Sequence, residues 1–144
     1  MINWFDKSAD PLKIIKELQA EKGITRAEAE KIVRKQVPKE SDFQKKIMEA
    51  VKKAYPKAVV VKIAQGEFSQ GGIPDLIAVI DGHFFGLEVK RPYFHGKTEG
   101  TLQAETIRRI REAGGTAGFI SYPQEALDMI EDYLKGVGKH GSED

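Results

Sequence analysis

Three residues of this sequence, Asp75, Glu88 and Lys90, have the types and the spacing to form a charged site. Asp81-Gly82 stands between two apolar runs, and this dipeptide is a strong signal for a two-residue β-hairpin turn. With that turn, Asp75 lies directly opposite Glu88, and Lys90 points to the same face of the sheet. Opposed carboxylates repel each other, so the pair favours a cation between them, either Lys90 or a divalent metal ion.

The composition favours a hard metal ion. The 144 residues include no cysteine and only three histidines, which excludes a thiolate zinc site and a cysteine-bound iron-sulfur cluster. Carboxylate oxygens, a backbone carbonyl and waters suit Mg²⁺ or Mn²⁺. The alternative is that Lys90 merely neutralises an acidic pair on the surface. The short segment Gly71-Gly72-Ile73-Pro74 leads directly into Asp75, and this favours a functional site because sites concentrate in loops on a rigid scaffold.

The elements that must position these residues predict an α/β fold. Apolar periodicity and turn signals predict a helix over 41–54, strands over 58–64, 76–80 and 83–90, a helix from 102 to 113, a strand over 116–121 and a helix over 123–134. This αβββαβα order predicts a mixed sheet with helices on its faces. The uniformly apolar run 76–80 predicts a central strand that is covered on both sides.

The first 38 residues predict a helical hairpin. Asp10-Pro11 opens the first helix and Gly23 ends it, while Thr25 and Glu28 form a capping box for the second helix, which Pro38 ends. Two short helices joined by a glycine turn are either a DNA-binding helix-turn-helix or a packing appendage, and both interpretations stay open.

The formal net charge of +1 hides strong local differences. Residues 39–62 carry seven lysines against three acids, and residues 88–111 carry six basic residues against three acids, so two basic segments flank an acidic centre. Each segment is either a solvated helix face or a surface for a polyanion. No apolar run is long enough to span a bilayer and no signal-like segment is present, so we expect a soluble cytoplasmic protein.

The residues around the acid pair resemble a nuclease family. Gly72-Ile73-Pro74-Asp75, followed after the hairpin by Gly86-Leu87-Glu88-Val89-Lys90, resembles the PD-(D/E)xK signature, and most closely that of the virus-type replication-repair (VRR-NUC) nucleases. The resemblance covers about residues 39–122 and includes Glu40 at the start of one helix and Gln103 early in another. It implies a restriction-endonuclease-like αβββαβ core, which we expect in a nuclease domain at 39–135. The helical hairpin appendage at 1–38 lies outside the resemblance, and the polar, glycine-rich stretch 136–144 is expected to be a flexible tail.

The resemblance also implies roles for individual residues. Asp75, Glu88 and the Val89 carbonyl would hold Mg²⁺ or Mn²⁺, and Lys90 would orient the attacking water. Glu40 and Gln103 are further candidate catalytic residues, although Glu40 is also a helix-start residue that offsets the helix dipole. Related branches often place a tyrosine four residues after the helical Gln, where this sequence has Ile107.

Basic side chains near the expected site are candidate phosphate contacts, which give affinity without sequence selectivity. They are Lys45, Lys46, Lys52, Lys53, Arg91, Lys97 and Arg108. The loop at 93–97 combines Tyr93 and Phe94 with basic groups, a composition that suits stacking on unpaired bases.

These observations together predict a metal-dependent DNA endonuclease. The substrate would be branched DNA, such as a Holliday junction, in replication, repair or recombination, and the source would be a phage or a prokaryote. A homodimer is expected where both strands are cut. The alternatives are a module of nuclease fold that binds nucleic acid without cutting it, and a structural subunit whose hairpin contacts another protein.

Overall fold

The computed structural model describes residues 1–64 and 71–143, and the side chains of the C-terminal part up to residue 136. The described residues form five helices and four strands: α1 (Pro11–Lys22), α2 (Arg26–Gln36), α3 (Glu40–Ala54), β1 (Val59–Lys62), β2 (Leu76–Ile80), β3 (His83–Val89), α4 (Leu102–Glu112), β4 (Thr116–Ile120) and α5 (Pro123–Glu143). The order of the elements is the predicted one.

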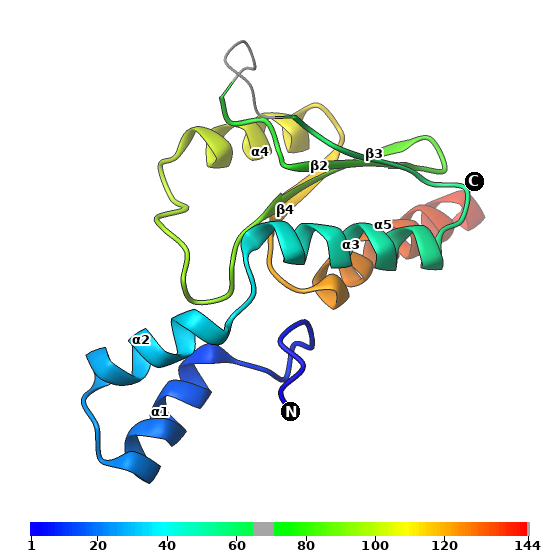
Figure 1. Ribbon diagram of the computed structural model, residues 1–144. Coiled ribbons are helices and arrows are strands. Elements are labelled where there is room, and N and C mark those ends of the chain that lie inside the picture. The colour runs from blue at the N-terminus through cyan, green and yellow to red at the C-terminus, as the bar shows by residue number, and fades with distance from the viewer. Residues whose placement is uncertain (65–70, 144) are drawn as a thin grey trace.

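The strands form one mixed sheet in the order β1-β2-β3-β4. β1–β2 and β2–β3 pair antiparallel, whereas β3–β4 is parallel. Helices α3 and α5 cover one face, and α4 packs on the other face against β3 and β4 (Figure 1). The α/β fold class with a mixed sheet and flanking helices is therefore confirmed.

The tight turn between β2 and β3 has the predicted chemistry. Asp81 and Gly82 both have positive φ angles, 51° and 79°. A type I′ turn requires positive φ at both central residues, and Asp-Gly is among the few pairs that adopt this conformation readily. The turn fixes the register of the two strands that carry the acid pair.

The prediction that strand 76–80 is covered on both sides was wrong. One face of β2 is buried through Leu76, Ala78 and Ile80, but Val79 on the other face is 39% exposed. The reason is that α4 lies over β3 and β4 and leaves the β1–β2 part of this face open, where Val59 and Val61 are also exposed. The strand with a continuous buried run is β3, from Phe85 to Val89.

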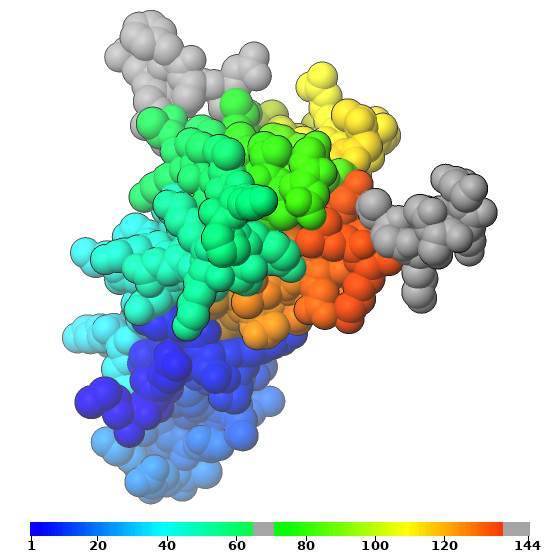
Figure 2. Space-filling view, turned by 90° about the vertical axis from the view of Figure 1, so that its right-hand side faces the viewer, coloured from blue at the N-terminus to red at the C-terminus, as the bar shows by residue number. Residues whose placement is uncertain are grey.

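The N-terminal residues form the predicted helical hairpin, with the Asp10 cap, the left-handed Gly23 and the Thr25–Glu28 capping box in place. The hairpin lies at one end of the molecule, below the sheet in Figure 1 and as the blue lobe in Figure 2. Its buried residues Ile15 and Val33 belong to the same hydrophobic cluster as the sheet residues, so the core is continuous between the two parts.

The C-terminal helix is longer than predicted. It continues past Leu134 to Glu143, through the residues expected to form a tail. The flexibility of residues 136–144 stays a prediction. None of the helices in the described part of the chain is long and apolar enough to cross a membrane.

Candidate active site

The register of β2 and β3 brings the two predicted carboxylates together. The strand pairs run from Ile80↔His83 to Leu76↔Leu87, so Asp75 and Glu88 form the next pair outward. The Asp75 N–H donates to Glu88 Oε1 at 3.1 Å, and the Val89 N–H donates to Asp75 Oδ2 at 2.9 Å. Each acid thus accepts a hydrogen bond from the backbone of the opposite strand.

The backbone around Asp75 is held on both sides. Its carbonyl accepts a hydrogen bond from the Ile63 N–H at 2.8 Å, which extends the β1–β2 pairing by one residue. On the way into β2, Gly72 has a φ of 90°, and a Cβ there would lie 2.8 Å from Leu102 and Thr106 of α4. Glycine is therefore required for the loop to pass this close to the helix, and this loop delivers Asp75 to the strand.

Glu88 lies in a place that disfavours its charged form. Only 3% of the residue is exposed. Burial, repulsion from Asp75 and a hydrogen bond with the Asp75 carboxyl raise the pKa of Glu88 to about 8, against a smaller opposing effect of Lys90. Near neutral pH and without a cation, Glu88 therefore retains its proton.

Glu40 begins α3 and faces the acid pair. Burial and, next, the charge of Asp75 raise the pKa of the Glu40 carboxyl, while Lys90 and Arg91 lower it. The charges of Asp75 and Lys90 thus act on Glu40, whose catalytic role stays a prediction. The Lys90 Nζ also lies 5.9 Å from the centre of the Phe119 ring on β4, at the margin of a cation–π contact.

Gln103 is the second residue of α4 and is half-buried. In the described part of the chain it makes no hydrogen bond with the acid pair, so its catalytic role stays a prediction. Ile107, one turn later, is buried with 4% exposed, which shows that this position faces the core and not the site.

The donor set of the pair suits a hard divalent cation. Carboxylate oxygens are the ligands that Mg²⁺ prefers. A bound cation would offset both the cost of burying the Glu88 charge and the repulsion between Glu88 and Asp75. No group of three or more His, Asp or Glu side chains within 1–64 and 71–143 is close enough to form a metal cluster by itself. Two carboxylates would therefore need backbone and water ligands to complete the coordination, as is common for Mg²⁺.

The four predicted lysines of α3 are exposed but lie on two sides of the helix. Lys45 and Lys52 line a shallow pocket together with Lys62 from β1. Lys46 instead lies 5.5 Å over the Phe5 ring and 3.9 Å from Glu49. Lys45, Lys52 and Lys62 thus form a group of basic side chains, with Glu49 in the lining of the same pocket.

Two predicted phosphate contacts already have protein partners. Arg91 donates through Nε to the Pro38 carbonyl at 3.0 Å, and through Nη2 to the carbonyls of Arg34 at 2.9 Å and Val37 at 3.0 Å. Arg108 is paired with two glutamates of its own helix. This arrangement does not support phosphate binding by Arg91, whose donors close the end of α2. Lys97 is exposed, and its contact with phosphate stays a prediction.

Tyr93 and Phe94 have partners within the protein, which does not support their predicted stacking on bases. The Tyr93 hydroxyl donates to Glu30 Oε1 at 2.5 Å, and the Phe94 ring lies 4.7 Å from the Arg34 guanidinium. Both rings pack against the hydrophobic cluster. The helical hairpin, which the sequence could not place, covers them.

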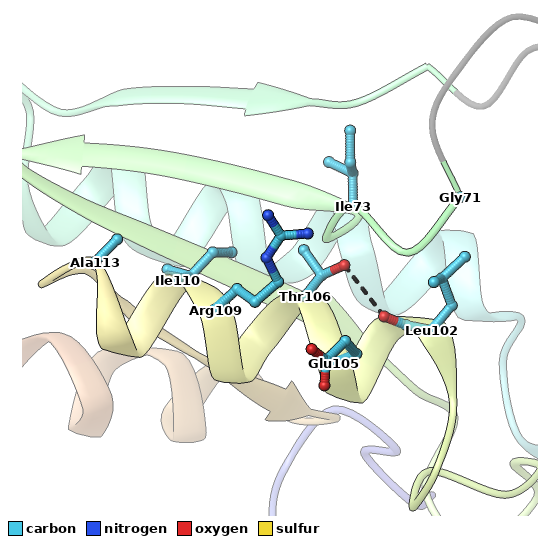
Figure 3. A pocket seen from close by; sticks show the side chains of 8 residues that line it. All are labelled: Gly71, Ile73, Leu102, Glu105, Thr106, Arg109, Ile110 and Ala113. Carbon is cyan, nitrogen blue, oxygen red and sulfur yellow. Dashed lines mark hydrogen bonds between the residues drawn. The ribbon is translucent and has the colours of Figure 1, made fainter.

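A groove of about 660 Å³ lies beside the site, between α4 and the segment that enters β2. Its lining includes Ile73, two residues before Asp75, and Leu102, which precedes Gln103 on α4. The Arg109 side chain extends from α4 toward Ile73 (Figure 3). Arg109 is one of the six basic residues of the segment 88–111, and the sequence alone did not place it in a groove. Its place in the groove depends on how α4 packs against the loop.

No protein-family model and no curated protein matches the chain. A solved structure described as "VRR_NUC domain" is similar to it, with a TM-score of 0.52 and 23% sequence identity. The similarity covers 65% of this chain and 96% of that one, so about a third of this chain has no counterpart there. The chain therefore has the fold of a VRR_NUC domain, which is the fold that the resemblance of its motifs implied.

Proposed function

We propose that the protein is a divalent-metal-dependent endonuclease that hydrolyses phosphodiester bonds of DNA. The observation that carries the proposal is the pair of the buried Glu88 and the half-buried Asp75, with Lys90 directly after the end of β3, on the fold of a nuclease domain. Two like charges side by side, one of them buried, are costly unless they bind a cation, and strongly shifted carboxyl groups mark functional sites.

The chain's own residues supply the parts of a hydrolytic mechanism. Asp75 and Glu88, with the Val89 carbonyl, would hold Mg²⁺ or Mn²⁺, and Glu88 would lose its proton in doing so. The bound ion would polarise the phosphate and lower the pKa of a water ligand. The Lys90 ammonium would orient the attacking water and stabilise charge on the phosphate oxygens, a contribution on the order of 3 kcal/mol. Glu40 would hold a further water at the start of α3.

Exposed lysines of α3 would bind the phosphate backbone. Lys45 and Lys52, with Lys62 beside them, form a basic surface on the helix that begins with Glu40. Such contacts are electrostatic and independent of sequence. The resemblance of the motifs to the VRR-NUC family supports selectivity for branched DNA and a homodimer that cuts both strands.

The direct test is a cleavage panel with Holliday junctions, flaps, splayed arms, plain duplex and single strands. We expect cleavage of branched DNA with Mg²⁺ or Mn²⁺ and none with EDTA. Binding without cleavage on every substrate would overturn the proposal in favour of a nucleic-acid-binding module of nuclease fold. Equal cleavage of branched and plain duplex DNA would remove the structure selectivity alone.

A further inference from the structure

The helical hairpin is joined to the segment after β3 by polar contacts between residues far apart in the sequence. Arg91 donates hydrogen bonds to the carbonyls at the end of α2, and the Tyr93 hydroxyl donates a hydrogen bond to Glu30. In addition, Arg26 Nη2 donates to the Tyr93 oxygen at 3.0 Å, and the Arg91 guanidinium lies 5.4 Å from the Phe94 ring. We call this set of contacts the hairpin junction.

Arg91 connects the two chain segments that carry site residues. It directly follows Lys90 in the sequence, and the Lys90 N–H is fixed to β4 by a hydrogen bond to the Ile120 carbonyl at 2.9 Å. Its Nε binds the carbonyl of Pro38, which is two residues before Glu40. One side chain thus bridges the end of β3 and the chain that leads into α3.

We propose that Arg91 is a positioning residue for the acid site, and that the carbonyl groups at the end of α2 hold it in place by accepting its hydrogen bonds. Arg91 holds the first turn of α3, with Glu40, at a fixed distance from Lys90 and the acid pair. The inference rests on the proposed nuclease function and extends it, because it makes the hairpin a support of the active site. We expect an arginine to be required because Arg91 reaches its carbonyls from two nitrogens, Nε and Nη2, in one rigid plane, whereas a lysine has a single nitrogen at the end of a flexible chain.

Steady-state cleavage kinetics of the full chain test this role. We expect Arg91→Ala to lower kcat about 10- to 100-fold with little change in KM, because misplaced groups slow the chemical step. Arg91→Lys should be as slow, since it retains the charge but not the fork. Restoration of the wild-type kcat by Arg91→Lys, or a raised KM with unchanged kcat, would overturn the proposal and indicate a phosphate contact. Lys22→Ala, an exposed change on the hairpin, is the control and should leave both constants unchanged.

Hydrogen exchange provides a second readout that does not depend on cleavage. The N–H groups of Asp42 and Phe43 both donate to the Lys39 carbonyl and report the first turn of α3. We expect Arg91→Lys and Arg91→Ala to speed their exchange while the amides of the first turns of α5 stay protected. Unchanged exchange at Asp42 and Phe43 would overturn the proposal. If the wild-type chain cleaves no DNA, the proposed function fails and this comparison alone decides the role of Arg91.

Discussion

The acid site and the hairpin junction are both built from charged groups, but they differ in how the charges are balanced. At the acid site two carboxyl groups lie side by side, and the backbone N–H groups of Asp75 and Val89 only partly compensate them. At the junction Arg91 meets three carbonyl oxygens, and Glu30 meets an arginine and a tyrosine hydroxyl.

This difference separates a binding site from a structural contact. Two like charges side by side, one of them buried, cost free energy until a cation or a proton neutralises them. The N–H groups of Arg91 instead already have carbonyl partners, and Glu40 partly offsets the charge of Arg91. Charged side chains at the acid site therefore indicate a binding site, whereas charged side chains at the hairpin junction indicate a structural contact. The following predictions test this contrast, in order of decreasing effect.

The largest effect is expected from Asp75→Asn, which keeps the side-chain shape but removes a charge from the acid site. We expect the cleavage rate to fall at least about 100- to 1,000-fold, in the range found when an electrostatic group of an active site is lost. The measurement is single-turnover cleavage with Mg²⁺. Asp81→Asn in the exposed β2–β3 turn is the matched control, because asparagine tolerates its positive φ. Normal cleavage by Asp75→Asn would make the acid pair a structural feature.

Val33→Ala tests whether the helical hairpin is a structural part of the same folding unit as the sheet. Val33 is 1% exposed and belongs to the cluster that continues into the sheet, so we expect a loss of about 2 kcal/mol of unfolding free energy. Urea denaturation should show one transition for the whole chain. Ile32→Ala, at a neighbouring position that is 37% exposed, is the control and should cost much less. Two separate transitions would show that the hairpin unfolds independently of the sheet.

The raised pKa of Glu88 predicts that metal binding depends on pH. Below the pKa of about 8 the ion must displace a proton, so the affinity for Mn²⁺ should rise about tenfold per pH unit from pH 6 to 7.5. Calorimetric titration at several pH values measures this slope. An Mn²⁺ affinity of the wild-type chain that does not change with pH would contradict the proposal that Glu88 is a metal ligand. Glu88→Gln should remove the pH dependence of the affinity.

The same pKa has the opposite consequence for the metal-free fold. The folded state holds the Glu88 proton more tightly than the unfolded chain, whose pKa is near 4.5. This contribution to the unfolding free energy is present below pH 4.5 and is lost as pH rises toward 8. Urea denaturation in EDTA should therefore show that Glu88→Gln loses less unfolding free energy than the wild-type chain between pH 4.5 and 8. An identical pH profile for both chains would contradict the burial of the Glu88 charge.

The smallest effects are expected at the exposed lysines of α3. Lys45→Ala and Lys52→Ala should each weaken DNA binding several-fold and reduce the salt slope of the affinity by about 1, because each removes one phosphate contact. Fluorescence anisotropy at several salt concentrations measures both quantities. Lys135→Ala, on α5 and paired with Glu131, is the control. An unchanged slope in the α3 variants would place the DNA elsewhere.

The sequence predicted the elements and the acid pair because their signals are local. The Asp81-Gly82 turn is short and conformationally demanding, so it determines which residues of β2 and β3 face each other. The helix caps at Asp10 and Thr25 are equally local, and both were confirmed. Once the turn is identified, the position of Asp75 opposite Glu88 follows by counting.

The junction could not be predicted because its partners are remote. Arg91 and the Pro38 carbonyl are 53 residues apart, and Tyr93 and Glu30 are 63 residues apart. No periodicity relates such positions, so exposed-looking aromatic and basic residues were interpreted as a nucleic-acid contact. The exposure of Val79 was missed for the same reason, since it depends on where α4 packs.

The two-residue turn between β2 and β3 also constrains which changes the protein can tolerate over evolution. Side chains alternate between the faces of a strand, so one inserted or deleted residue at Asp81-Gly82 that shifts the register would turn one acid of the pair to the opposite face. Substitutions along β2 and β3 alter single contacts, but a change in the length of the turn between these strands separates Asp75 from Glu88. We therefore expect homologous chains that retain both acids to vary in strand residues while preserving the number of residues between them.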